Sequence, residues 1–188
     1  MKKLILFAAI LFAGVSLSSA QAPVVTEGKQ DFGTTKLNVI LTPFQTITVN
    51  TTQNEVSLEY NRAELYKTGV TSPEQVEHLL IESTGAFDVT VKAEDLKSTI
   101  DHSKTMSAST IMIKSISNTA KELKGATTRT VRLANNDVKL ISSSKGGTSK
   151  AFDITYTAAK DDKYTENYML NNQKTTYTTD IYYTITAR

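Results

Sequence analysis

The feature that most constrains the fold of this chain is the alternation of apolar and polar residues over many short stretches. In "AFDVTVK", Phe87, Val89 and Val91 alternate with Asp88 and Thr90. Successive side chains of a β-strand point to opposite faces, so a period of two indicates a strand with one buried face. Similar stretches occur at 36–42, 45–50, 55–60, 109–116, 130–134, 137–142, 151–157 and 181–187.

Polar turns that contain Gly or Asn separate these stretches, which predicts about nine or ten strands. Short alternating strands at this spacing are typical of an antiparallel sandwich. We therefore predict an all-β, Ig-like antiparallel β-sandwich with one or two short helical turns. The residues expected to face its core are Val56, Leu58, Phe87, Val89, Ile111, Ile113, Val131, Phe152 and Ile154.

Two stretches carry signals for short helical turns. Ser72 is a candidate N-cap before Pro73, which predicts one turn at Ser72–Gln75 and then a strand through "HLLIEST". A second turn is expected within Ser117–Thr127, where Gly125 would end it. Neither stretch is long enough to form an independently stable helix.

The first twenty residues have the pattern of a Sec signal peptide. Lys2 and Lys3 precede an apolar run from Leu4 to Val15, and Ala20 is a suitable cleavage position. The run is too short to span a bilayer. We therefore expect an exported protein with a signal peptide at 1–20, a flexible segment at 21–35 and a single domain at 36–188. We expect it in the periplasm in transit and then at the cell surface, with no transmembrane segment in the mature chain.

The charge of the exported chain is close to zero. The sequence has 21 Lys and Arg and 19 Asp and Glu, and two of the lysines lie in the signal peptide, so 19 of each sign remain. A neutral chain without a basic run has no electrostatic attraction for nucleic acid or for an anionic membrane. There is no Cys, which excludes both a disulfide and a lipid-anchored bacterial lipoprotein.

The sequence contains no recognisable catalytic or metal-binding motif. The two histidines, His78 and His102, lie in unrelated contexts, one in a strand-like stretch and one in a polar loop. Neighbouring carboxylates such as Glu94 and Asp95 would point to opposite faces of a strand, which does not fit a paired-carboxylate site. We predict that the protein is not an enzyme and binds no cofactor or metal.

Five tyrosines gather late in the chain and have two interpretations. On one face they would make an aromatic platform for sugars, whereas tyrosines spread over strands are ordinary sheet packing, which we favour. The five are Tyr164, Tyr168, Tyr177, Tyr182 and Tyr183.

The two ends of the exported chain together resemble a known family. After a polar segment, "LNVILTP" at 37–43 precedes "EVSLEY" at 55–60, and the chain runs to an alternating strand that contains Tyr182 and Tyr183. In this pattern the chain is similar to subunits of chaperone–usher pili, above all to the cysteine-free α-class fimbrial subunits. The similarity covers the whole exported chain as a pattern of strands.

The resemblance implies an Ig-like sandwich that lacks one strand, which the N-terminal strand of a neighbouring subunit supplies. Leu37, Val39 and Leu41 would be the donor strand, although "VVTEGKQDF" at 24–32 also fits, and a third alternative is that the chain has none. Ile181, Tyr183 and Ile185 would form the inward row of the docking edge. The implied partners are like subunits, a periplasmic chaperone and an outer-membrane usher.

Two hypotheses of function follow from the sequence. The first is a structural subunit of a fimbria or similar surface fibre, joined to its neighbours by β-strand addition and related to adhesion. The second is a self-complete secreted sandwich that binds a glycan or another host or surface ligand. In the second case residues 36–42 pair within their own domain and the tyrosines line an exposed face.

Overall fold

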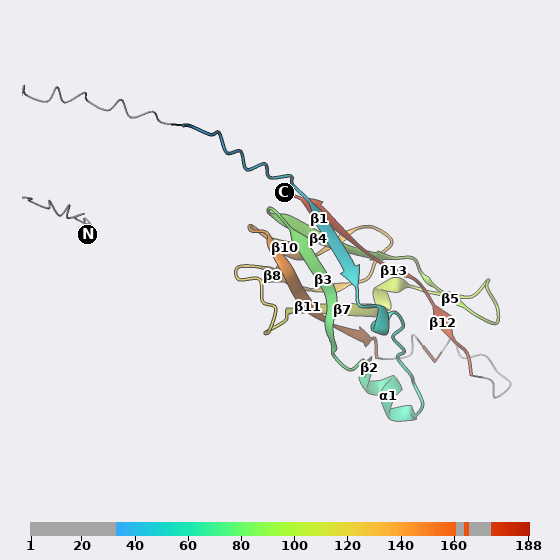
Figure 1. The fold of residues 1–188 in the computed structure, drawn as a ribbon. Coiled ribbons are helices and arrows are strands. Elements are labelled where there is room, and N and C mark those ends of the chain that lie inside the picture. The colour runs from blue at the N-terminus through green and yellow to red at the C-terminus, as the bar shows by residue number, and fades with distance from the viewer. Residues whose placement is uncertain (1–32, 161–163, 166–173) are drawn as a thin grey trace, which may run out of the picture. The chain divides into compact units, whose positions relative to one another are not determined.

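The computed structural model describes residues 33–160, 164–165 and 174–188 (Figure 1). The predicted signal peptide and the alternative donor stretch at 24–32 lie outside the described residues. The chain divides between Ile40 and Leu41, and the residues from Leu41 to Arg188 form one unit that contains every described strand. No helix within the described ranges is long and apolar enough to cross a membrane.

The fold is all-β and antiparallel, as predicted, with thirteen strands in the described residues. Six of them have only two or three residues, which is why the number exceeds the nine or ten expected. The strands are β1 (Gln45–Val49), β2 (Val70–Thr71), β3 (Gln75–Ser83), β4 (Phe87–Ala93), β5 (Leu96–Ser98), β6 (Thr105–Met106), β7 (Ile111–Ser117), β8 (Thr127–Thr128), β9 (Thr130–Arg132), β10 (Val138–Ser143), β11 (Gly147–Ala158), β12 (Tyr177–Thr178) and β13 (Ile181–Ala187).

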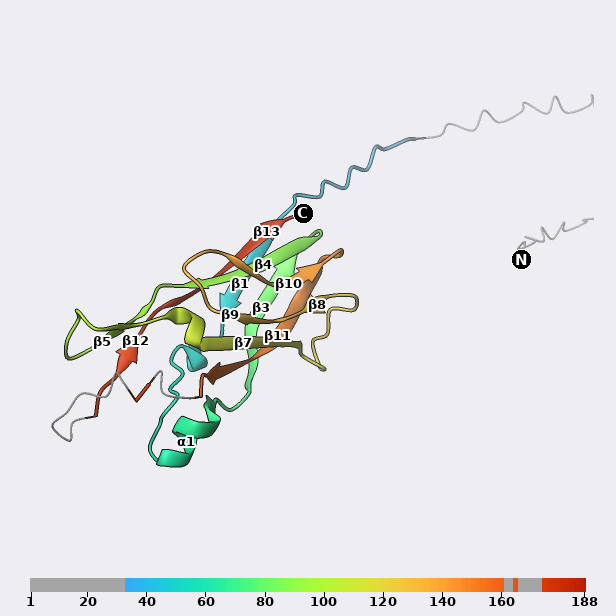
Figure 2. The ribbon, with the colours of Figure 1, turned by 180° about the vertical axis from the view of Figure 1, so that it is seen from behind.

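The strands form three sheets. The first has the order β1-β3-β11-β7-β9, with β2 paired to β11, and the second has the order β13-β4-β10-β8. These two sheets are the layers of the sandwich. The third, β12-β5-β6, extends beyond the ends of β4 and β13, since β5 follows β4 and β12 precedes β13 (Figures 1 and 2).

The core lies between the first and second sheets. Phe87, Val89 and Val91 of β4 are fully buried, and so are Phe152 and Ile154 of β11. Of the nine core residues predicted, six are buried, and Val56, Leu58 and Val131 are half-buried and pack against them. Alternation therefore identified the inward face of these strands correctly.

One side of the sandwich is closed by a single stretch of chain. Residues 127–132 pair with the second sheet through β8, opposite Ile141 and Ser142, and then with the first sheet through β9, opposite Ile113. Between the two, the carbonyl of Arg129 accepts a hydrogen bond from the amide of Ser115. The same stretch thus completes both sheets on this side.

The helical turns lie elsewhere than predicted. The described residues contain two 3-10 turns, η1 (Thr51–Gln53) and η2 (Ala108–Thr110), and one short helix, α1 (Ala63–Thr68). Neither Ser72–Gln75 nor 117–127 is helical. Ser72 does not cap a helix because β11 engages it. Its amide donates to the carbonyl of Tyr156, and its hydroxyl accepts from the amide of Tyr156.

Two of the expected strands, 36–42 and 55–60, belong to no sheet in this structure. Both have the alternating pattern, but a strand also needs a neighbouring backbone, and no ladder partner lies beside either of them within the described residues. The prediction of a strand at 55–60 was wrong for the described residues. For 36–42, only the hypothesis of a self-complete sandwich requires a ladder partner in its own domain, whereas a donor strand would pair with a neighbouring subunit. These two stretches bear directly on the candidate site.

Candidate functional site

The last strand, β13, forms one edge of the second sheet and directs its apolar row into the sandwich. Tyr183 lies opposite Val91 of β4, and Ile185 lies opposite Val89. Residues directly opposite each other in an antiparallel pair share a face, so this row points to the core. Ile181, Tyr183 and Ile185 are nevertheless only half-buried. The structure therefore places the predicted row on the inner face of a strand that stays partly open to solvent.

Strand β1 is the edge of the first sheet on the same side of the molecule. Ile47 lies opposite Ile81 of β3 and Val49 opposite Leu79, yet both residues of β1 are only half-buried. Each of β1 and β13 has a strand on one side alone among the described residues, and the two lie side by side (Figure 1). We call these adjacent edges, with Ile47, Val49, Ile181, Tyr183 and Ile185, the seam.

The stretch that follows η1 extends the apolar surface beyond β1. Val56, Leu58 and Tyr60 are half-buried and pack against the core, while Glu55, Ser57 and Glu59, which alternate with them, are exposed. The hydroxyl of Tyr60 donates to the carbonyl of Ala159. Side-chain packing thus holds this stretch on the sandwich, although its backbone joins no ladder in the part of the chain that the structure describes.

A chain of polar side chains connects the seam to the first sheet. The Tyr183 and Tyr156 hydroxyl oxygens are 2.7 Å apart, and the Tyr156 oxygen is 2.9 Å from Nε2 of His78. His78 Nδ1 is 3.0 Å from Oε1 of Gln53. The His78 ring meets the rings of Tyr156 and Tyr183 edge to face. Sequence analysis placed His78 in a strand-like stretch, but no sequence signal could show that three elements converge on it.

Burial changes the pKa values of the hydrogen-bonded side chains His78, Tyr156 and Tyr183. It lowers the pKa of His78 from its ordinary value of 6.5, because a charged imidazole is poorly solvated there. It raises the pKa of Tyr156 to about 12. Burial, and then the neighbouring Tyr156, raise the pKa of Tyr183 well above its usual range. At neutral pH all three side chains are therefore uncharged.

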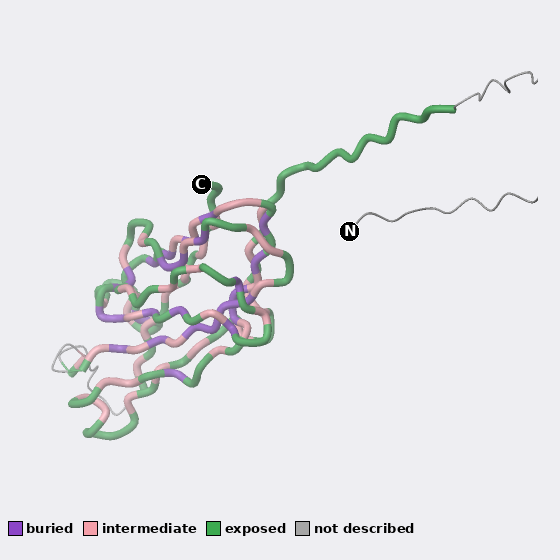
Figure 3. Tube along the Cα trace, turned by 90° about the vertical axis from the view of Figure 1, so that its left-hand side faces the viewer, coloured by how far each residue is buried: buried purple, intermediate pink, exposed green. Residues whose placement is uncertain are grey.

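The candidate donor stretch is exposed along all of its described length (Figure 3). The exposed fraction is 86% for Leu37 and Leu41 and 77% for Val39. Ile40, which lies on the opposite face of the alternating stretch, is also 86% exposed. Four large apolar side chains within five residues are thus left in water, which is unfavourable for a stretch that stays unpaired.

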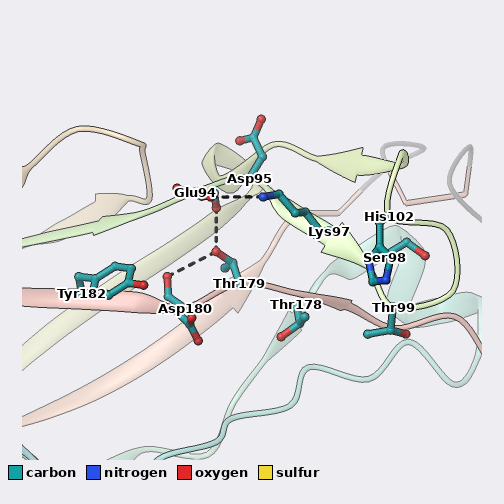
Figure 4. Close-up of a pocket in the computed structure, with 10 residues that line it drawn as sticks. All are labelled: Glu94, Asp95, Lys97, Ser98, Thr99, His102, Thr178, Thr179, Asp180 and Tyr182. Atoms are coloured by element: carbon teal, nitrogen blue, oxygen red, sulfur yellow. Dashed lines mark hydrogen bonds and ion pairs between the residues drawn. The ribbon is translucent and has the colours of Figure 1, made fainter.

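A pocket of about 340 Å³ lies at the far end of β13 from Ala187 (Figure 4). Several polar groups of the pocket already bind other groups of the protein. The Asp95 carboxylate accepts from the amide of Ala108, and Glu94 forms an ion pair with Lys97 at 3.4 Å. The pocket is lined by Glu94, Asp95, Lys97, Ser98, Thr99, His102, Thr178, Thr179, Asp180 and Tyr182.

The late tyrosines do not form a common platform in the described residues. Tyr183 faces the core, Tyr182 is 52% exposed beside the pocket, and Tyr164 packs against Tyr60 with ring centres 4.9 Å apart. Tyr177 lies in β12, and Tyr168 is outside the described residues. Within those residues no group of three or more acidic or histidine side chains is placed to hold a metal ion.

Comparison with known proteins adds no assignment. No family model and no curated protein matches the sequence of this chain. The resemblance to fimbrial subunits therefore rests on the pattern of the sequence.

Proposed function

We propose that this chain is a structural subunit of a fimbria or similar cell-surface fibre, exported through its signal peptide and joined to like subunits by β-strand addition. One observation carries the proposal: the inward apolar row of the seam is only half-buried, on two adjacent edges that have no further strand among the described residues. An added strand would cover this row and pair with a backbone edge that is otherwise open to aggregation.

The stretch 34–42 has the chemistry of a strand that could be added. Its side chains alternate, with Leu37, Val39 and Leu41 on one face, and the three are exposed. Nine residues of extended chain are also sufficient to run alongside the seven residues of β13. Placed along the seam of a neighbour, the row would contact the half-buried row there.

Local geometry disfavours pairing of this stretch with its own domain. The Phe44 amide donates to Oγ1 of Thr84, and the Thr84 amide donates to the Phe44 carbonyl, so Phe44 is already held beside the end of β3. A tight reversal would then need Pro43 at its first central position. Two-residue hairpins require a positive φ there, whereas proline fixes φ near −65°. These two facts favour an acceptor on another copy of the chain.

Removing the stretch and returning it as a peptide tests the proposal. We expect residues 43–188 to be stabilised by a peptide spanning Thr34–Thr42, since a ligand that binds only the folded state adds about 2.7 kcal/mol at 100 times its Kd. The same peptide with Val39→Asp is the matched control. Thermal melts measure both. A shortened chain that is as stable alone as with the peptide would contradict strand addition.

A periplasmic chaperone and an outer-membrane usher are the partners that the resemblance to fimbrial subunits implies for this proposal. Co-purification of the exported chain from periplasm, compared with a Tyr183→Asp, Ile185→Asp variant, tests for a chaperone on the β13 edge. Loss of the same bound protein in the variant is the expected result.

The second candidate function, ligand binding by a self-complete sandwich, has one observation in its favour. Tyr182 presents an exposed ring at the pocket, and Asp180 lines the same pocket. An aromatic ring and a carboxylate together are a common way to hold a sugar. A glycan array probed with the exported chain and with Tyr182→Ala tests this candidate, which predicts binding that the substitution removes.

A further inference from the structure

The hydrogen-bond chain at the seam has a defined direction. The Gln53 amide nitrogen donates to the carbonyl of Val76 at 2.9 Å, so its Oε1 is the atom that faces His78. A neutral imidazole has one N–H, which must then lie on Nδ1 and donate to this oxygen. Nε2 is left as an acceptor for the Tyr156 hydroxyl. The Tyr156 hydroxyl has one proton and donates it to Nε2 of His78, so the Tyr183 hydroxyl must donate to the Tyr156 oxygen.

A second proton on His78 would reverse this direction. Nε2 would become a donor to the Tyr156 oxygen, and Tyr156 would have to turn its proton toward Tyr183. The Tyr183 proton would then have no acceptor, because the Tyr156 oxygen is its hydrogen-bond partner among the described residues. The unpaired donor therefore lies on β13. Its unfavourable free energy adds to that of a charge buried inside the sandwich.

We propose that protonation of His78 reverses the direction of these hydrogen bonds and weakens the contact of β13 with the first sheet, so that the seam opens in mildly acidic solution. The Tyr183 hydroxyl connects β13 to Tyr156 of β11 and, through it, to His78 of β3. Its release would leave the middle of β13 held by its ladder with β4 and by apolar packing, so the edge strand would open more easily. Where the seam holds an added strand, which rests on the proposed function, acid would speed the exchange of that strand.

Among the described residues, no charged group contributes to the shift in the pKa of His78. Burial alone causes the shift in the pKa of His78. The facing groups are the amide of Gln53 from η1 and the two tyrosines from β11 and β13, which stay protonated in acid, and neither β1 nor η1 contains a titratable residue. Glu77, which precedes His78 on β3, pairs with Lys121, and Asp153 accepts from the Glu77 amide and from Asn118.

Nuclear magnetic resonance of the exported chain, residues 21–188, tests the geometry. The sequence has two histidines, so a His102→Gln variant assigns the His78 imidazole signals. We expect the Nδ1–H tautomer at neutral pH and a titration midpoint below 6.5. An Nε2–H tautomer, or an ordinary midpoint, would overturn the proposal.

Hydrogen–deuterium exchange tests the consequence. Below pH 6.5, after correction for intrinsic rates, we expect β13 amides to lose protection by up to about tenfold per pH unit, since one proton is bound on opening. Amides of β7, in the first sheet, should keep their protection from exchange over the same pH range. His78→Gln, which can donate and accept but cannot be charged, should abolish the effect, and His102→Gln should retain it.

Equal loss in β7 and β13, or equal loss in the His78→Gln variant, would overturn the proposal. Should His78→Gln not fold, the same decision rests on whether β13 protection in the wild-type chain follows the His78 titration. These measurements use the single chain without assembly. Their failure is therefore distinguishable from failure of strand addition, which the peptide experiment tests separately.

Discussion

Phe152 lies on β11, between β3 and β7, and its side chain is fully buried. Phe152→Ala removes most of a large apolar side chain and leaves a cavity, so we expect a loss of about 3–5 kcal/mol in the free energy of unfolding. Urea denaturation measures it. The control is Val76→Ala, at an apolar residue that is 51% exposed, where we expect a change below about 0.5 kcal/mol. Equal midpoints for the two variants would mean that the wrong face of the strand has been assigned to the core.

Strand β13 presents two faces that allow a matched test at the scale of one element. Tyr183 and Ile185 face inward, whereas Thr184 and Thr186 face outward and are exposed. We expect Tyr183→Asp with Ile185→Asp to cost on the order of 1–3 kcal/mol per site, because each substitution puts a polar group into a partly desolvated row. Strand addition predicts that the double variant, produced with its signal peptide, is degraded or remains unassembled.

The control for this experiment is Thr184→Asp with Thr186→Asp, which adds the same two charges to the same strand on its solvent face. Thermal melts and the yield of assembled material from the periplasm measure both pairs. Similar losses from the inner and outer pairs would show that added charge, rather than the inward row, limits the strand.

For the whole molecule, strand addition predicts that the exposed stretch matters for assembly and not for the stability of one domain. We expect Val39→Asp with Leu41→Asp to leave the melting temperature of the single chain unchanged, since both residues are exposed. Strand addition also predicts oligomers of the exported chain that resist SDS, and the same variant should lose them, as measured by electrophoresis and size-exclusion chromatography. Asn38→Asp with Thr42→Asp alters the opposite face and should keep them. Retention of the oligomers by the first pair would exclude this stretch as the donor.

The sequence by itself determined which stretches are extended and which face of each is apolar. Alternation is local, and it follows from the two-residue period of a strand, so Phe87 and Val89 of β4 or Phe152 and Ile154 of β11 could be assigned to the core without knowledge of their neighbours. The inward row of the last strand, Ile181, Tyr183 and Ile185, follows from the same rule.

The neighbours of each strand were decided by the tertiary structure alone. Ile185 lies opposite Val89, far away in the sequence, and nothing in either stretch specifies the other. Residues 55–60 alternate as regularly as β4 and yet join no ladder with any described residue, because pairing depends on which backbone lies alongside. The side-by-side position of β1 and β13, and the convergence of Gln53, His78, Tyr156 and Tyr183, likewise arise from contacts between distant stretches. A local pattern specifies the direction of a side chain, whereas only the packing of the whole chain specifies what that side chain meets.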